Sequence, residues 1–211
     1  MAGRYNDKIV VKNRFFKVDA ARNGGKKATG KKLSGHFKYL EHRPKDEEQE
    51  PDKKETREDR YIFDAERDHV TRKDAVNDVT DHTSHRAAYH VLVLSPDPDE
   101  PVSDLRQWTR DIMHDLAESK GQDLHWYAVQ HHNTEHPHVH VVIAGGAEKE
   151  GQEKREPVTI FHSDIDQLHE SAFAHSDHEL YQQLDQMHLH DLQELGQELA
   201  ITISQHDGLE R

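Results

Sequence analysis

Alternation of apolar and polar residues is most regular between Trp126 and Gly145, in the run WYAVQHHNTEHPHVHVVIAG. In an extended strand, successive side chains point to opposite faces. Val139 and Val141 are therefore expected in a core. His138 and His140 then share the opposite face, where the strand holds the two imidazoles side by side.

A second apolar run, from Trp126 to Val129, lies just before His131. The residues between the two runs include Asn, Thr and Pro, which are typical of a turn. If the two strands pair as a hairpin, His131 returns beside His138 and His140. Neutral imidazole binds Zn, Mn, Fe, Ni or Cu, and three protein ligands leave coordination positions open for substrate. The pattern predicts a catalytic metal site.

The chain between His90 and Gly121 predicts the elements that support this hairpin. The residues from His90 to Leu94 indicate a strand, and a Ser-Pro turn begins at Ser95. Ser103 is expected to cap a helix that ends near Gly121. The apolar positions of this helix fall on one face and belong in a core: Leu105, Trp108, Ile112 and Leu116. Together these elements predict an α+β fold with an antiparallel sheet.

The order of residues in the hairpin resembles the metal-binding motif of the HUH endonuclease superfamily. Within it, the similarity is to conjugative relaxases and mobilisation nucleases, including the branch that nicks T-DNA borders, and it covers His90 to Gly145. The resemblance implies that His131, His138 and His140 are metal ligands. It also implies that Asn133, where many relatives carry Asp, and Ser95 lie against DNA.

A tyrosine motif of the same branch is similar to the segment SGHFKYLEHRP, which predicts a short helix that ends at a proline. Relaxases carry their nucleophilic tyrosine before the histidine motif, so the resemblance implies that Tyr39 is the nucleophile. Arg43, one helical turn later, is then a phosphate contact. Rolling-circle replication initiators and HUH transposases carry the tyrosine after the histidines, which leaves Tyr181 as an alternative.

The resemblance implies a ferredoxin-like antiparallel sheet of about five strands, with helices packed on one face and the histidine motif on a central strand. It implies metal-dependent, strand-specific nicking of single-stranded DNA at an origin of transfer, through a 5′-phosphotyrosine intermediate, in plasmid or mobile-element mobilisation. Mg²⁺ or Mn²⁺ is the expected ion, with Zn, Ni and Co as alternatives. An accessory DNA-binding protein and a coupling protein are the expected protein partners.

Two questions remain open at this level. The proton of the nucleophile has several candidate acceptors: the metal, Asp81, Glu41 or a water molecule. A non-catalytic metal- and DNA-binding accessory protein is the alternative function, and it is favoured by Asn133 and by an acidic tail.

Charge divides the chain into three regions. The net charge is −13, yet residues 1–38 hold eleven Lys or Arg against two Asp, a net charge of +9 that leaves −22 for the rest. We expect a basic N-terminal arm at 1–38, with Lys31, Lys32 and Lys38 on DNA. A nuclease core is expected at 39–163, with an exposed or disordered loop at 43–59. An acidic, His-rich helical tail is expected at 164–211, because Lys and Arg are absent from 164–210.

The chain has no cysteine and no apolar run long enough for a signal peptide or a membrane span. A cytoplasmic location without membrane insertion is therefore expected. Full-length relaxases usually carry a further C-terminal region, so 211 residues suggest a minimal nuclease, a truncated homologue or an excised domain.

Overall fold

Four antiparallel strands form the sheet that carries the predicted histidines, in the order β1-β2-β5-β4. Their bounds are Val10–Phe16 for β1, Tyr89–Ser95 for β2, Trp126–His131 for β4 and His138–Ala144 for β5. The computed structural model describes residues 9–17, 25–42, 60–98, 102–132, 137–149 and 155–176. All of them belong to one unit, Met1–Ser176.

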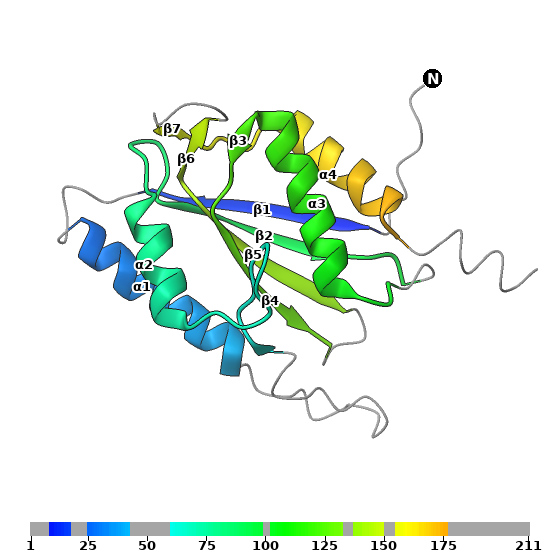
Figure 1. The fold of residues 1–211 in the computed structure, drawn as a ribbon, viewed down its shortest axis with the longest axis horizontal. Coiled ribbons are helices and arrows are strands. Elements are labelled where there is room, and N and C mark those ends of the chain that lie inside the picture. Colours follow the sequence, from blue (N-terminus) through cyan, green and yellow to red (C-terminus); the bar gives the residue numbers. More distant parts are fainter. Residues whose placement is uncertain are drawn as a thin grey trace, which may run out of the picture. The chain divides into compact units, whose positions relative to one another are not determined.

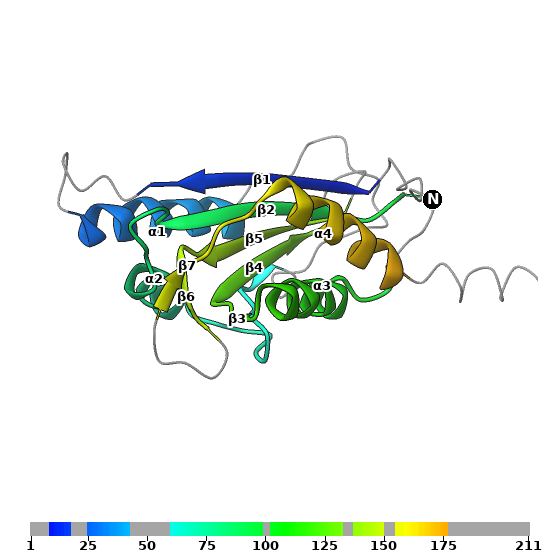
Figure 2. The same ribbon diagram turned by 90° about the horizontal axis from the view of Figure 1, so that it is seen from above.

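Helices cover both faces of this sheet (Figures 1 and 2). One face is packed by α1 (Lys26–His42) and α2 (Arg72–Asp81), the other by α3 (Leu105–Lys120) and α4 (His162–Ala174). The α+β class and the antiparallel sheet agree with the sequence analysis, whereas the expectation of helices on one face differs from the structure. The reason lies in β2 and β5, whose apolar residues alternate between two buried clusters. A strand buried on both faces reads as a continuous apolar run.

The helix α3 begins one residue later than predicted. Its N-cap is Asp104 rather than Ser103, because the Asp104 carboxylate accepts hydrogen bonds from the backbone N–H groups of Arg106 and Gln107. Gly121 ends the helix with a left-handed φ of 56°, a conformation that costs glycine little. Trp108 is buried, as predicted, and its indole N–H donates to the carbonyl of Ala172 on α4 at 2.9 Å.

The basic segment expected as an arm contributes two elements to the folded unit. Strand β1 pairs with β2 along its whole length, and α1 packs Leu33, Phe37 and Leu40 against the sheet. Charge concealed the strand, because Lys12 and Arg14 alternate with Asn13 and Phe15 and interrupt the apolar pattern of β1. Residues 1–8 and 18–24 and the loop at 43–59 lie outside the described residues.

The first part of the expected acidic tail also belongs to this unit. Leu168 and Ala172 of α4 are buried in the same apolar cluster as α3. Residues 177–211 lie outside the described residues.

A second, small sheet closes one end of the fold in the order β3-β6-β7. It consists of β3 (Gln122–Asp123), β6 (Gly146–Lys149) and β7 (Arg155–Pro157). Gly145 joins β5 to β6 where the backbone passes very close to the chain before β2: a Cβ at this position would lie 1.9 Å from the carbonyl oxygen of Ala87. Within the described residues, no helix is both long enough and apolar enough to span a membrane.

Candidate active site

The β4–β5 hairpin brings the three predicted histidines together. His131 at the end of β4 pairs with His138 on β5, and Val129 pairs with His140. Paired residues of antiparallel strands point to the same face, and residues two apart on one strand do so as well. All three imidazoles therefore lie on the sheet face covered by α1 and α2, while Val139 and Val141 enter the opposite core.

The geometry of the three histidines fits a metal ion. One ring nitrogen from each lies within 4.8 Å of those of the other two. The ring centroids are 5.1–5.3 Å apart, and the ring planes are inclined by 63–88°. Three nitrogen donors that converge from one side form a facial set, which leaves the remaining coordination positions toward the substrate.

His131 is fully buried and is held by the backbone of α1. Its Nε2 lies 2.9 Å from the carbonyl oxygen of Leu40. A carbonyl oxygen accepts, so Nε2–H donates and the lone pair of the neutral ring is on Nδ1. A backbone carbonyl that fixes the tautomer of a histidine is the usual support of a metal ligand. The last turn of α1 is thus attached directly to the histidine cluster.

Tyr39 precedes Leu40 in this last turn of α1. Leu40 and Phe37 are buried beneath the helix, whereas the Tyr39 side chain is 56% exposed. Packing therefore does not account for a tyrosine at this position. The phenol of Tyr39 lies on the exposed side of α1. The next residue, Leu40, is hydrogen-bonded to the predicted metal ligand His131.

The structure narrows the candidate acceptors for the phenol proton. Asp81 forms an ion pair with Lys26 at 3.5 Å, at the opposite end of α1 from Tyr39. These ends are thirteen residues apart, roughly 20 Å along a helix, so Asp81 is removed as a candidate. Glu41 is engaged by Arg72, whose Nε lies 2.5 Å from its carboxylate.

The remaining predicted site residues differ in their surroundings. Ser95 is buried, and its hydroxyl donates to the carbonyl of Pro137 at 2.9 Å, which holds the strand next to His138. Lys31, Lys32 and Lys38 are exposed on α1. The Lys32 ammonium lies 4.7 Å from the ring centroid of Phe16 on β1. Arg43, Asn133 and Tyr181 lie outside the described residues.

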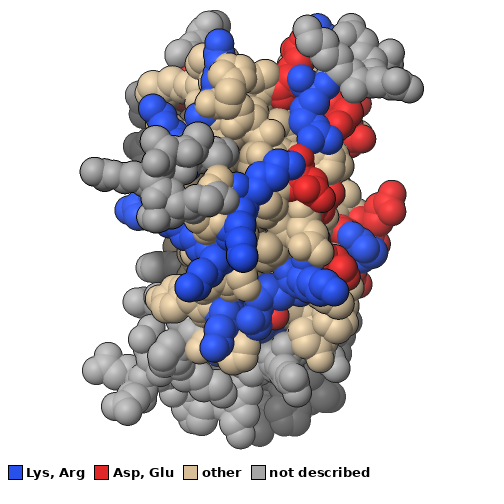
Figure 3. Space-filling view, turned by 90° about the vertical axis from the view of Figure 1, so that its left-hand side faces the viewer, with Lys and Arg blue, Asp and Glu red and all other residues tan. Residues whose placement is uncertain are grey.

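Basic side chains on β1 extend this surface toward the histidines. Lys12 pairs with Val93, and Val93 pairs with His140, so the three residues form a row across the sheet and point to the same face. With strands about 4.8 Å apart, Lys12 is roughly 10 Å from His140. Figure 3 views the side where α1 and α2 lie and shows Lys and Arg in a broad band, with Asp and Glu along one margin.

The family model of the relaxase nuclease domain, described as MobA/VirD2-like, matches residues 39–152. This range covers more than half of the chain and contains Tyr39 and the three histidines. The chain belongs to the MobA/VirD2-like relaxases. Among individually curated proteins, none matches it. Membership of this family assigns a DNA-nicking nuclease domain of a typically metal-dependent kind, and the three histidines form a group of side chains that could hold such an ion.

Sequence reasoning missed two features. Lys12 was predicted only as part of a basic segment. Its place on the histidine face was missed, because strand β1 was not predicted. A second group of possible metal ligands, Asp78, His82 and His125, was also missed. The spacing of Asp78 and His82, four residues apart on one helix face, was the available signal.

Proposed function

We propose that this relaxase nicks single-stranded DNA at an origin of transfer by transesterification, with Tyr39 as the nucleophile and His131, His138 and His140 as the metal ligands. The observation that carries the proposal is the hydrogen bond between His131 and the carbonyl of Leu40. It fixes the helix turn that bears the exposed Tyr39 against the histidine cluster.

The proposed reaction exchanges one phosphodiester for another. The Tyr39 oxygen attacks the scissile phosphorus, a bond forms between them, and the bond to the 3′ oxygen breaks. The product is a 5′-phosphotyrosine, and the 3′ oxygen takes up a proton to become a free hydroxyl. The phenol proton passes to solvent, to which Tyr39 is open. A divalent ion at the three imidazoles supplies positive charge for the non-bridging phosphate oxygens.

The single strand is proposed to follow the basic side chains of β1 and α1 to Tyr39. Lys12 on β1 and Lys38 on α1 are both exposed. Lys12 is on the histidine face, and its distance from the cluster is comparable to the Debye length of about 8 Å at physiological salt. Phosphate contacts of this kind supply affinity and register rather than sequence choice. Mg²⁺ or Mn²⁺ is the proposed ion for DNA cleavage.

Formation of a covalent adduct tests the proposal. The full chain is incubated with Mn²⁺ and labelled single-stranded oligonucleotides that include the origin of its own element, and the adduct is followed on denaturing gels and by intact mass. We expect an adduct with the wild-type protein that Tyr39→Phe abolishes. Tyr61→Phe is the matched control, because Tyr61 is a part-buried tyrosine that stacks on His69 at 4.2 Å.

Two results would redirect the assignment. Loss of the adduct in Tyr181→Phe, with Tyr39→Phe active, would indicate the chemistry of replication initiators or transposases. DNA and metal binding without an adduct on any oligonucleotide would indicate an accessory protein.

A further inference from the structure

A second group of metal-ligating side chains lies at the opposite end of β4 from the three histidines. Asp78 is in α2, His82 is its C-cap, His125 directly precedes β4 and Glu148 is on β6. Donor atoms of Asp78, His82 and His125 lie within 4.8 Å of one another. His125 and His131 are six residues apart, so the two groups are separated by roughly 20 Å of extended chain. The ions of a two-metal catalytic centre are about 4 Å apart, so this group is a separate site.

Hydrogen bonds fix which nitrogen of each ring carries the hydrogen. Nδ1 of His125 lies 3.0 Å from Oδ2 of Asp78, and Nδ1 of His82 lies 2.8 Å from the Asp78 carbonyl oxygen. The hydroxyl of Tyr127 also donates to Oδ2 of Asp78, at 2.9 Å. Both rings therefore donate through Nδ1–H, and in the neutral rings the lone pairs are on Nε2.

Both Nε2 atoms face the carboxylate of Glu148. The Nε2 of His125 is 3.4 Å from Oε2, and that of His82 is 4.0 Å from Oε1. The two rings are stacked, with centroids 3.6 Å apart and planes inclined by 17°. Among the described residues, the buried Oε2 of Glu148 accepts no hydrogen bond. Two lone pairs and a carboxylate that converge in this way repel one another unless a cation lies between them.

One of the two donor separations matches that of a metal site. In a tetrahedral zinc site with bonds of about 2.0–2.1 Å, neighbouring donor atoms are roughly 3.4 Å apart. The 3.4 Å between Nε2 of His125 and Oε2 of Glu148 equals this value, whereas the 4.0 Å between Nε2 of His82 and Oε1 of Glu148 is longer and has to shorten on binding. Arg155 also holds the carboxylate in place, because its guanidinium donates to Oε1 of Glu148 at 3.0 Å and to the carbonyl of Asp81 at 2.6 Å.

We propose that His82, His125 and Glu148 bind a divalent transition-metal ion, with Asp78 as the carboxylate that orients both imidazoles. Two nitrogen donors favour Zn²⁺, Co²⁺ or Ni²⁺ over Mg²⁺. A carboxylate or carbonyl on the second ring nitrogen is the usual support of such ligands. The ion joins α2, the start of β4 and the small sheet, so its role is to stabilise this end of the fold.

A proton bound to His125 is the alternative to a metal ion in this cluster. The hydrogen bond with Asp78 raises the pKa of His125 above its usual value. A protonated His125 would neutralise Glu148 without a metal. The two occupants differ in their response to added metal at about pH 8, where most imidazoles are neutral.

Metal content and thermal stability of the full chain distinguish these occupants. The test variant is His82→Ala/His125→Ala. The matched control is His114→Ala/His162→Ala, which removes two exposed histidines from α3 and α4. After dialysis against Zn²⁺ at about pH 8, we expect the test variant to hold one zinc fewer per chain than the wild type and the control. We also expect it to lose a zinc-dependent rise in Tm of about 5 °C, the size expected at a hundredfold excess over Kd.

A second variant covers the case in which the double variant does not fold. Glu148→Gln keeps the side-chain volume and removes one ligand charge. It is expected to lower the zinc affinity of this site by at least about tenfold while nicking is retained. Zinc content and Tm shift equal to those of the wild type in the folded variants would overturn the proposal and leave the proton as the occupant.

Discussion

The two histidine clusters at the ends of β4 differ in what surrounds them. His131, His138 and His140 come from one hairpin and have an exposed tyrosine helix beside them. His82 and His125 come from different elements and converge on Glu148, with Asp78 behind the rings. The first cluster offers three neutral donors from one side. The second surrounds its centre with donors from three elements, and two of its side chains are carboxylates.

The proposed roles of the two clusters follow from this difference. The three histidines of the first cluster converge from one side and leave room for a phosphate. The backbone carbonyl of Leu40 orients His131 without adding charge. The second cluster joins α2 to the start of β4 and to the small sheet. An ion bound there restrains these segments relative to one another.

The largest difference is expected in nicking. His140→Ala removes a proposed metal ligand of the first cluster and should lower the rate of adduct formation by more than about 100-fold. Loss of a residue that only hydrogen-bonds to a metal ligand typically lowers activity by about 10–100-fold. Glu148→Gln should change that rate by less than about threefold, because its carboxylate is far from the reacting phosphate. Single-turnover assays with saturating Mn²⁺ measure both rates. Equal losses in the two variants would mean that the clusters act as one site.

Salt dependence of DNA binding is expected to differ between the two ends of the sheet. Lys12→Glu/Lys38→Glu removes two proposed phosphate contacts beside the first cluster. The slope of log K against log salt should become shallower by about 1.4, since each contact on single strands contributes about 0.7. Arg86→Glu/Lys149→Glu makes the same change in net charge at the other end of the sheet and is the control. Fluorescence anisotropy over a salt series gives the slopes, and the same slope for both variants would refute a DNA path along β1.

Stability without metal is expected to depend on the second cluster. Asp78→Asn weakens the hydrogen bonds that Asp78 accepts from His125 and Tyr127 and should cost about 1–3 kcal/mol of unfolding free energy. Burial opposes ionisation of Asp78, but these hydrogen bonds outweigh it and lower its pKa. Urea unfolding in EDTA measures the cost, and the folded fraction should nick at an unchanged rate. An unfolding free energy equal to that of the wild type would contradict a stabilising role.

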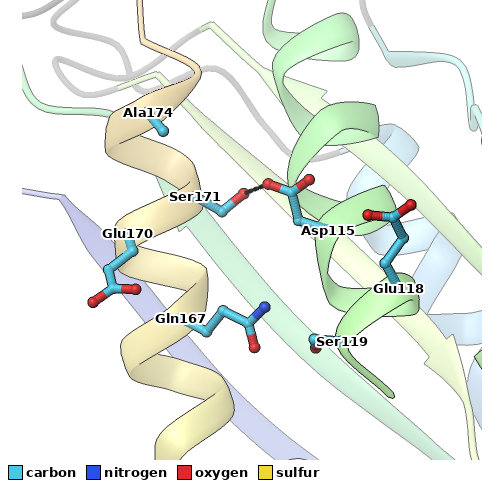
Figure 4. Close-up of a pocket in the computed structure, with 7 residues that line it drawn as sticks. All are labelled: Asp115, Glu118, Ser119, Gln167, Glu170, Ser171 and Ala174. Atoms are coloured by element: carbon cyan, nitrogen blue, oxygen red, sulfur yellow. Dashed lines mark hydrogen bonds between the residues drawn. The ribbon is translucent and has the colours of Figure 1, made fainter. Parts of the chain in front are cut away.

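The smallest effect is expected in the acidic groove between α3 and α4, where the hydroxyl of Ser171 donates a hydrogen bond to the carboxylate of Asp115 (Figure 4). Burial raises the pKa of Asp115, but its hydrogen bonds with Ser171 and His175, at 2.6 and 2.9 Å, outweigh this and lower the pKa overall. A lowered carboxyl pKa stabilises the fold above the unfolded value of about 3.9 and loses that effect as the pH falls below it.

Asp115→Asn should therefore cost less than about 1 kcal/mol near neutral pH, since the pair is partly exposed. The cost should shrink below about pH 4, as Asp115 of the wild type becomes protonated. Urea unfolding over a pH series checks this, and the zinc-dependent rise in Tm should be intact in this variant. A loss of that rise would mean that zinc stabilises the chain through other carboxylates as well.

The sequence predicted the first cluster far better than the second, for a physical reason. His131, His138 and His140 belong to one hairpin, where strand periodicity and a turn determine their positions. The second cluster depends on how α2 packs beside β4 and β6, a contact between segments more than forty residues apart that no local pattern encodes. Strand β1 was missed for another reason. It is an edge strand with basic residues on one face, and such a sequence is typical of a solvated segment.

Peptide mapping of the covalent adduct identifies the nucleophile. The wild-type protein is captured on an oligonucleotide with Mn²⁺, digested with nuclease and protease, and the residue that retains a nucleotide phosphate is identified by tandem mass spectrometry. We expect the phosphate on the phenol of Tyr39. A phosphate on Tyr181 or on any other residue would contradict it.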